Sequence, residues 1–222
     1  MHSVKLIAIT QPIDELGGTA ENAIAYMARV SNPNNQNNNE TSDKLIRYLI
    51  QNDHWSPFEM ISVVIEITTT RDISRQILRH RSFSFQEFSQ RYAVVENFDT
   101  NREPRLQDLK NRQNSVDLDY SYEPHRELAF NWMMIQKATL EASQKAYEWA
   151  IENDIAKEQA RALLPEGLTM SKLYMSGTLR SWIHYCQLRM ENGTQKEHAL
   201  IAKDCWKIIG NHFPNVIKAL QK

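Results

Sequence analysis

Residues 61–91 read ISVVIEITTTRDISRQILRHRSFSFQEFSQR, and this stretch decides most of what the chain can be. Its first ten residues are rich in β-branched side chains, which is typical of a buried strand. Residues 71–80 are predicted to form a short helix, in which Arg71, Arg75 and Arg79 recur every four positions along one face. Like charges at this spacing repel one another, so an anion beside the helix would stabilise it. Because a guanidinium offers a planar fork of donors that suits phosphate, the segment predicts a site for a phosphorylated ligand.

The rest of the chain alternates between predicted strands and helices without an internal repeat. Besides residues 61–70, strands are predicted at 4–10, 92–95 and 172–176. Helices are predicted at 19–30, 42–51, 124–153, 156–164, 179–190 and 194–212. The predicted apolar faces are Leu45, Tyr48 and Leu49 in the second helix, and Leu128, Trp132, Ile135, Leu140 and Tyr147 in the third. A few strands among several helices predict an α+β fold of one domain, residues 1–222, with a small, mostly antiparallel sheet flanked by helices.

Two polar stretches, residues 32–41 and 98–122, are predicted to be mobile loops. The first is rich in asparagine, whose side chain favours turns over regular structure. The second is charged and only weakly periodic, and loops of this length often act as lids over a functional site. We therefore expect the conformational freedom of the domain to concentrate in these two segments.

The overall composition is that of an ordinary globular protein with balanced charge. The 222 residues are 41% hydrophobic and 24% charged, and the formal net charge is −1. Domains that bind nucleic acid usually present a broad basic face, so this balance argues against the alternative in which residues 71–81 form a recognition helix. No membrane span or signal peptide is expected, because the chain lacks the apolar runs that these need. No disulfide framework or Cys-based zinc site is expected either, since the only cysteines are Cys186 and Cys205. We expect reduced thiols in a cytoplasmic protein, or in the host cytoplasm if the source is viral.

Glycine is missing from the long stretch between Gly18 and Gly167. Both the G-x-G-x-x-G fingerprint and the Walker A loop need glycines that bring the backbone close to phosphate, so neither fits across most of the chain. A bound nucleotide must therefore be held mainly by side chains. The arginine-rich segment described above is the obvious source of those side chains.

Residues 54–59, HWSPFE, precede the central strand and combine a histidine with a glutamate. Chemistry alone predicts a loop here, with Trp55 and Phe58 packed into the core. His54 and Glu59 are five positions apart, which suits no common zinc spacing on a helix, and we predict no metal site. A metal hydrolase is nevertheless an alternative from another class, and it would use His54, Glu59, His80 and Glu87.

Three further groups carry polar side chains whose role the residues alone leave open. Ser89, in the run Ser-Gln-Arg at 89–91, is predicted to bind phosphate or to cap a turn; the local pattern is not G-x-S-x-G, and no histidine is placed to activate a nucleophile. Arg161 precedes Leu-Leu-Pro and could simply interact with a helix dipole. Arg180 and His184 share a helical face ahead of Arg189, a pattern that is also typical of an amphipathic surface helix.

Taken together, these segments resemble one family. The pattern R-H-R at 79–81, seven further residues and Ser89 is similar to the motif of the flavin-dependent thymidylate synthases, the ThyX family. The resemblance extends in the expected order over Ser31, which follows A-R-V, and over the blocks 54–59, 76–92, 161–165 and 180–197. Five separated blocks in the same order are improbable by chance, so the resemblance covers most of the chain.

The resemblance implies the reaction, the cofactor and the assembly. It implies that dUMP is converted to dTMP, with methylenetetrahydrofolate as carbon donor and NADPH as reductant, through bound FAD and without an enzyme nucleophile. It also implies a ThyX-like fold and a homotetramer with sites between subunits. The predicted helix at 124–153 could supply part of that interface.

The resemblance also assigns the site residues. It places Arg189, Arg79 and Ser89 in catalysis, where the two arginines would stabilise charge on the uracil carbonyl oxygens. For dUMP it implies Gln76, Arg79, Glu87, Ser89, Gln90, Arg91, Arg161 and Arg189, with Glu87 toward the ribose and residues 89–91 toward the phosphate. For FAD it implies Ser31, His54, Ser56, Glu59, Arg79, His80, Arg81, Glu87, Thr178, Arg180 and His184.

Overall fold

A four-stranded antiparallel sheet forms the centre of the molecule, in a computed structural model that describes residues 2–221. The strand order is β1 (Ser3–Ile9), β2 (Ser62–Thr70), β6 (Met170–Thr178) and β3 (Ser84–Glu87). Each neighbouring pair is antiparallel, and β2 pairs with β6 along its whole length, from Ser62 opposite Thr178 to Thr70 opposite Met170. The predicted α+β class with a small antiparallel sheet is confirmed.

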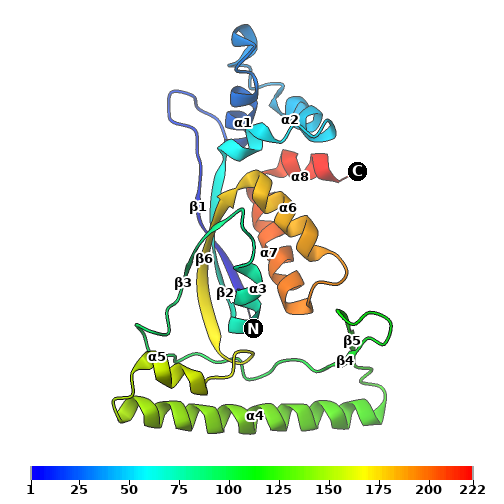
Figure 1. Ribbon diagram of the computed structural model, residues 1–222. Helices are drawn as coiled ribbons and strands as arrows, with labels where there is room; N and C mark the ends of the chain where they lie inside the picture. The colour runs from blue at the N-terminus through cyan, green and yellow to red at the C-terminus, as the bar shows by residue number, and fades with distance from the viewer. Residues whose placement is uncertain (1, 222) are drawn as a thin grey trace.

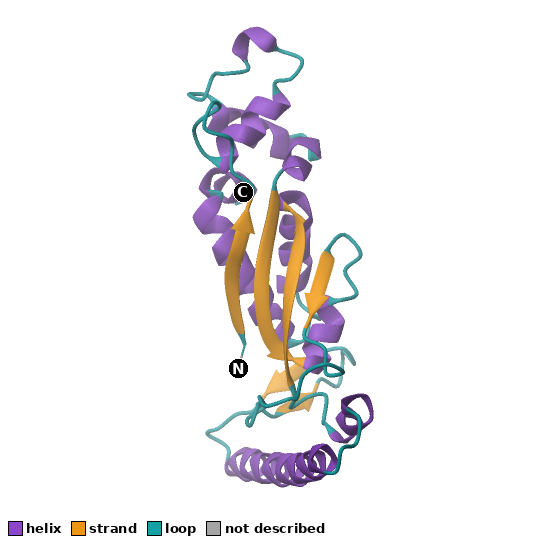
Figure 2. Ribbon diagram, turned by 90° about the vertical axis from the view of Figure 1, so that its left-hand side faces the viewer, coloured by secondary structure: helices purple, strands orange, loops and turns teal. Residues whose placement is uncertain are grey.

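Helices cover one face of this sheet and both of its ends. The helices are α1 (Ala20–Ala28), α2 (Ser42–Gln51), α3 (Arg71–Ile77), α4 (Glu123–Glu152), α5 (Lys157–Ala160), α6 (Leu179–Met190), α7 (Lys196–His212) and α8 (Pro214–Leu220). Figure 1 shows α6 and α7 beside the sheet, α1, α2 and α8 at one end, and the long α4 with α5 at the other. Figure 2 shows the opposite face of the strands with no helix in front of it. No helix within residues 2–221 has the length and apolar character needed to cross a membrane.

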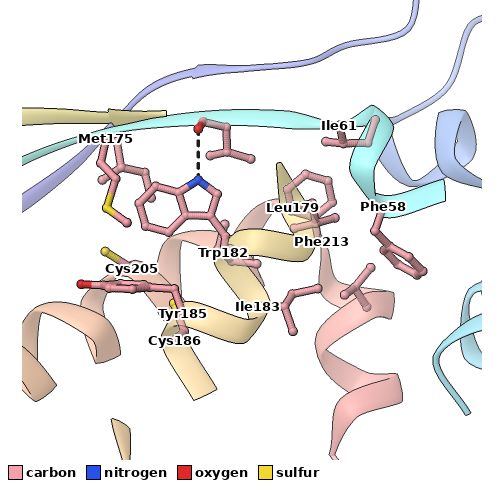
Figure 3. Packing of buried hydrophobic residues seen from close by; sticks show 14 of the residues in the cluster. Phe58, Ile61, Met175, Leu179, Trp182, Ile183, Tyr185, Cys186, Cys205 and Phe213 are labelled. Atoms are coloured by element: carbon pink, nitrogen blue, oxygen red, sulfur yellow. Dashed lines mark hydrogen bonds between the residues drawn. The ribbon is translucent and has the colours of Figure 1, made fainter. Parts of the chain in front are cut away.

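The main core lies between the sheet and the helix pair α6–α7 (Figure 3). Alternate residues of β2 point inward, so Ile65 and Ile67 are fully buried. Trp182 of α6 is also fully buried, and its Nε1 donates a hydrogen bond to the carbonyl oxygen of Val63 at 3.0 Å. This bond satisfies the indole N–H in an apolar setting, so the ring fixes how α6 lies on the sheet.

Local sequence explains several element boundaries. Thr19 caps α1, since its hydroxyl accepts from the backbone N–H of Asn22 while the Asn22 side chain accepts from the Thr19 backbone. Thr178 ends β6 and caps α6 through the backbone N–H of Ser181. Gly177 allows Phe83 to lie against β6, because a Cβ at that position would come within 2.4 Å of the phenyl ring.

Several elements differ from the predictions. The helix predicted at 156–164 is a short α5 followed by the 3-10 helix η3 (Arg161–Leu163). Helix α3 ends at Ile77 rather than at residue 80, so Arg79 does not continue the face of Arg71 and Arg75. The strand predicted at 92–95 is wrong, and β3 lies earlier, where it pairs with β6. The predicted loop 98–122 contains a hairpin of β4 (Arg105–Gln107) and β5 (Ser115–Asp117). Helix α8 lies within the stretch after residue 212, where no element was predicted. Strand β3 depends on pairing with β6, which is distant in sequence, and local patterns do not show such a partner.

The predicted apolar faces are only partly buried. In α2 the buried apolar side chains are Ile46, Leu49 and Ile50, while Tyr48 is 54% exposed. In α4 Leu140 and Tyr147 are buried as predicted, but most apolar side chains of its N-terminal half are exposed. Its exposed apolar side chains include Leu128, Phe130, Trp132, Met133, Met134 and Ile135. This half of α4 therefore carries apolar surface that the single chain does not cover.

Candidate active site

Predicted flavin residues from three elements meet at the N-terminus of α6: Glu59, Thr178, Arg180 and His184. We call these four, together with His54 in the loop before η2, the α6 N-terminal cluster. The 3-10 helix η2 (Ser56–Met60) carries Glu59. Its carboxylate accepts a hydrogen bond from the Thr178 hydroxyl at 2.6 Å and one from Arg180 at 2.7 Å. Thr178 thus both caps α6 and joins it to η2 through its hydrogen bond to Glu59.

Electrostatics at this cluster hold Glu59 as an anion. The hydrogen bonds from Thr178 and then from Arg180 lower the pKa of Glu59. Burial, followed by the charge of Arg180, lowers the pKa of His184, whose ring lies 4.9 Å from that of Trp55. His54 is exposed and its ring lies 6.0 Å from that of Tyr48. The cluster therefore combines a carboxylate, a guanidinium and imidazoles beside an aromatic ring, a mixture that suits a polar aromatic ligand.

Ser56 and Ser31, which are also predicted to bind flavin, make no hydrogen bond within this cluster among the described residues. Ser56 begins η2 and is exposed, next to the cluster in sequence. Ser31 is exposed in the turn that follows α1, and the described residues give it no hydrogen bond to the α6 N-terminal cluster. Phe58 is fully buried and Trp55 packs against the core, as the residues alone predicted for this segment.

A second group of predicted residues lies at the other end of α6. The Nε atom of Arg189 donates a hydrogen bond to Nε2 of His80 at 2.9 Å. The His80 ring stands nearly perpendicular to the ring of Tyr185, with centroids 4.8 Å apart. Burial and the charge of Arg189 lower the pKa of His80 to about 4. His80 is therefore a neutral acceptor near pH 7, and the terminal nitrogens of Arg189 have no hydrogen-bond partner among residues 2–221.

Gln76, predicted to bind dUMP, is half-buried and lies in a chain of hydrogen bonds. Its Nε2 donates to Oε1 of Gln195 at 2.7 Å, and its Oε1 lies 3.4 Å from Nδ1 of His198. The other ring nitrogen of His198 lies 3.0 Å from the hydroxyl of Tyr185. Sequence analysis missed His198 and Tyr185 as parts of the site. The only available signal was that His198 directly follows the Q-x-E block of the family motif.

A third group forms a cavity of about 520 Å³ beside α3, which we call the arginine pocket. Its charged and polar lining residues are Arg71, Arg75, Gln90, Glu158, Arg161 and Glu166. Gln90 is 3% exposed, and its Nε2 atom has no hydrogen-bond partner among the described residues. A buried amide nitrogen without an acceptor is costly, so the pocket suits a ligand that brings acceptor oxygens.

Arg91 and Arg161 converge on Glu158 at the rim of this pocket. Arg91 pairs with the Glu158 carboxylate at 3.2 Å, and Nε of Arg161 donates to the Glu158 backbone oxygen at 3.2 Å. Arg75 pairs with Glu166 at 2.5 Å. The hydroxyl of Ser89 accepts from the backbone N–H of Arg91 at 3.4 Å and has no bond to a histidine among residues 2–221. These contacts give Ser89 the surroundings of a turn and not those of an activated nucleophile.

The remaining predicted residues lie between these groups or outside them. Glu87 on β3 accepts from the hydroxyls of Ser74 at 2.6 Å and Ser171 at 2.8 Å. Arg79 and Arg81 are exposed, and neither has an ion-pair partner within the described part of the chain. Among those residues no three His, Cys, Asp or Glu side chains are arranged to hold a metal ion, which leaves the metal-hydrolase alternative without a site.

One chain does not bring all the predicted residues together. The α6 N-terminal cluster lies at the end of β6 that carries Thr178, whereas the arginine pocket includes Thr169 just before its start. Nine residues of strand separate the two by about 30 Å. Within α6, Arg180 and Arg189 are about 13 Å apart along the helix axis. The structure thus shows three separate groups of candidate residues in a single chain.

Comparisons with known proteins identify the family of the chain. The family model described as "Thymidylate synthase complementing protein" matches residues 13–215. A probable flavin-dependent thymidylate synthase of Paramecium bursaria Chlorella virus 1 is 48% identical over 218 residues, which cover 98% of each chain. A flavin-dependent thymidylate synthase of Synechocystis sp. is 48% identical over 221 residues, 98% of this chain and 99% of the relative.

A solved structure shares the fold. The UMP/dUMP methylase PolB from Streptomyces cacaoi, bound with 5-Br dUMP, matches with a TM-score of 0.80 and 24% sequence identity. The match covers 99% of this chain and 94% of the PolB chain. Its low identity makes it evidence for the fold alone. The family model and the two relatives span nearly the whole chain, and the chain therefore belongs to the flavin-dependent thymidylate synthase family.

Proposed function

We propose that this chain is an FAD-dependent thymidylate synthase that converts dUMP to dTMP, with methylenetetrahydrofolate as carbon donor and NADPH as reductant. Family membership supports the reaction class, and the names of its relatives support the use of a flavin. A relative of the same fold was crystallised with a brominated dUMP, which supports the choice of nucleotide. We place the enzyme in the cytoplasm, or in the host cytoplasm if the source is viral.

One observation carries the assignment of the nucleotide site. The arginine pocket presents the guanidinium groups of Arg71, Arg75 and Arg161 together with the buried, unpartnered Nε2 of Gln90. A phosphate supplies the acceptor oxygens that this nitrogen and these fork-shaped donors require. We assign the phosphate of dUMP to this pocket, with Ser89 and Arg91 at its rim. In this arrangement the phosphate competes with Glu158 for Arg91.

We assign the flavin to the α6 N-terminal cluster, together with Ser31, Ser56, His80, Arg79, Arg81 and Glu87 of the family pattern. The donor set of the cluster fits such a ligand, because it offers a cation, imidazole donors and an aromatic neighbour. The bond network around Glu59 holds the Arg180 side chain in one orientation. When bound, the flavin supplies the hydride, so the chain itself must bind and orient the flavin and the nucleotide and polarise the uracil ring.

Arg189 and Arg79 are assigned the electrostatic role on the uracil ring. Arg189 uses Nε to bond His80, which leaves its two terminal nitrogens for the carbonyl oxygens of the nucleotide. Donors held in place before the reaction stabilise the charge that develops on those oxygens at little reorganisation cost. Ser89 contributes to phosphate binding, and no enzyme nucleophile takes part.

The separation between the clusters supports a site shared between copies of the chain. Flavin and uracil must touch for hydride transfer, yet Arg180 and Arg189 are about 13 Å apart along α6, and the pocket assigned to the phosphate lies about 30 Å from the α6 N-terminal cluster along β6. The sheet face without helices and the exposed apolar side chains of α4, including Phe130 and Ile135, offer surface for association. We propose a homotetramer in which neighbouring chains bring the clusters together.

Absorbance and turnover test the proposed reaction. Purified protein reconstituted with FAD is expected to absorb in the near-ultraviolet and visible range. Under anaerobic conditions, the reduced, FAD-loaded protein is then expected to be reoxidised only when dUMP and methylenetetrahydrofolate are both present, with dTMP as product. Protein that binds no flavin, or that is reoxidised without forming dTMP, contradicts the proposal.

A mixing experiment tests the shared site. Arg180→Ala removes a residue of the α6 N-terminal cluster, and Arg161→Ala removes one of the arginine pocket. Each variant alone is expected to be inactive, whereas mixed oligomers regain activity because one chain supplies an intact cluster and its neighbour an intact pocket. Mixed oligomers, confirmed by tags on each variant, that stay inactive would show that each site is built from one chain.

A further inference from the structure

A chain of buried and half-buried polar side chains runs from the β4–β5 hairpin to the core of α6. At the hairpin, a terminal nitrogen of Arg105 lies 2.7 and 2.8 Å from the two carboxylate oxygens of Glu197. Glu197 accepts from Nε2 of Gln195 at 3.0 Å, and Gln195 accepts from Gln76 at 2.7 Å. The chain continues through His198 and ends at the hydroxyl of Tyr185.

The carboxylate of Glu197 sets the direction of every bond in this chain. Burial disfavours its charge, but the hydrogen bond and charge of Arg105 outweigh that effect and lower the pKa of Glu197. An ionised carboxylate only accepts, so Gln195 must turn its amide nitrogen toward Glu197 and its oxygen toward Gln76. Gln76 must then donate to Gln195, and its own oxygen faces His198.

The tautomer of His198 follows from the same order. Because the oxygen of Gln76 faces Nδ1 of His198, that nitrogen carries the proton, and Nε2 accepts from the Tyr185 hydroxyl. His198 is 1% exposed, and burial, with the charge of Arg189 nearby, lowers its pKa to about 3. The ring therefore stays neutral, and a single proton arrangement satisfies all members of the chain.

We propose that Glu197 and His198 are positioning residues that hold the Gln76 amide in one of its two orientations. The inference rests on the proposed function, with Gln76 contacting dUMP as the family resemblance implies. A glutamine amide that turns over exchanges its donor and acceptor. A uracil ring presents carbonyl oxygens and an N–H at fixed places, so the wrong orientation replaces attraction with repulsion. This chain of hydrogen bonds thus selects the orientation of the Gln76 amide that faces the nucleotide.

Glu197→Gln tests the inference, because it keeps the shape of the side chain and removes the charge that sets the direction. With FAD-loaded enzyme, calorimetric titration with dUMP is expected to show a Kd raised roughly fivefold, with the flavin absorbance and the melting temperature little changed. Lys196→Gln is the matched control, since Lys196 also anchors the hairpin region, through Glu103 and Asp117, but lies outside the chain. Lys196→Gln is expected to leave the Kd for dUMP unchanged. If Lys196→Gln raises this Kd as much as Glu197→Gln does, the inference is overturned.

A double-mutant cycle separates positioning from general loosening. Gln76→Ala alone is expected to raise the Kd, and adding Glu197→Gln to it is expected to cause no further rise, because Glu197 acts through Gln76. If Glu197→Gln does not fold, Tyr185→Phe removes the donor at the other end and is expected to show the same non-additivity. Additive effects in either cycle overturn the inference while the proposed function stands. A wild-type enzyme that binds no dUMP overturns both.

Discussion

The Nε atom of Arg189 donates a hydrogen bond to Nε2 of His80 at 2.9 Å, and the two residues are 109 positions apart. The bond joins the last turn of α6 to the R-H-R segment, so two blocks of the family motif meet directly. It requires an unprotonated Nε2 on His80, which agrees with the low pKa of that ring. The chemistry of the arginine therefore depends on the protonation state of its neighbour.

Arg189→Lys is expected to reduce dTMP formation by roughly a hundredfold or more while FAD binding and the fold survive. Lysine keeps the positive charge but loses both the Nε donor to His80 and the planar fork. Single-turnover measurement of dTMP, with circular dichroism as the control for folding, checks this. Turnover near the wild-type rate would remove Arg189 from its assigned role.

Stability is expected to fall as the pH is lowered below neutral. The pKa of His80 is lowered from 6.5 to about 4, and that of His198 to about 3. Between those values and 6.5 the unfolded chain binds protons that the folded chain does not, so acidification favours unfolding. Urea unfolding at about pH 7.5 and about pH 5.5 measures the slope.

His80→Gln provides the matched test of this pH dependence. The variant is expected to lose less stability between the two pH values than the wild type, because one depressed imidazole is gone. His212→Gln, at the exposed last residue of α7, is the control for replacing a histidine by glutamine away from the candidate site. An unchanged slope in His80→Gln would contradict the assignment of the effect to this ring.

Ser89→Ala is expected to raise the Kd for dUMP about fivefold and to slow the chemical step little. The hydroxyl lies in a turn beside Arg91, where it can donate to phosphate, and no histidine is placed to activate it. Titration calorimetry and single-turnover rates at saturating dUMP separate binding from chemistry. Complete loss of chemistry with dUMP still bound would instead favour a nucleophilic serine.

Glu158→Gln is expected to lower the Kd for dUMP about threefold at low salt, with a smaller effect at high salt. In the structure the Glu158 carboxylate pairs with Arg91, so a phosphate must compete with it for the same guanidinium. The neutral amide removes that competition. Glu148→Gln, at an exposed site on α4, serves as the control for net charge. Weaker binding in Glu158→Gln would mean that the glutamate holds Arg91 ready for the ligand.

Local patterns predicted the elements that depend on local chemistry. The β-branched run at 61–70 became β2, and the helices predicted at 42–51 and 179–190 have those bounds in the structure. The resemblance placed Glu59, Thr178 and Arg180 in one set, and the structure joins all three through hydrogen bonds. The strand β3 escaped prediction because it pairs with β6, which is distant in sequence. The strands of the β4–β5 hairpin are neighbours in sequence, and they escaped because their stretch of chain is polar and only weakly periodic.

The sequence alone determined the family and the main strands and helices. It also showed that a nucleotide must be held without a glycine-rich loop. Each of these conclusions depends on side-chain chemistry at short spacing along the chain. Only the tertiary structure decided which charges meet. It grouped Arg71, Arg75 and Arg161 in one pocket, left Arg79 exposed, and enclosed His198 between Tyr185 and Gln76. Such groupings depend on how strands pair and helices pack, and burial then sets the protonation of the histidines involved.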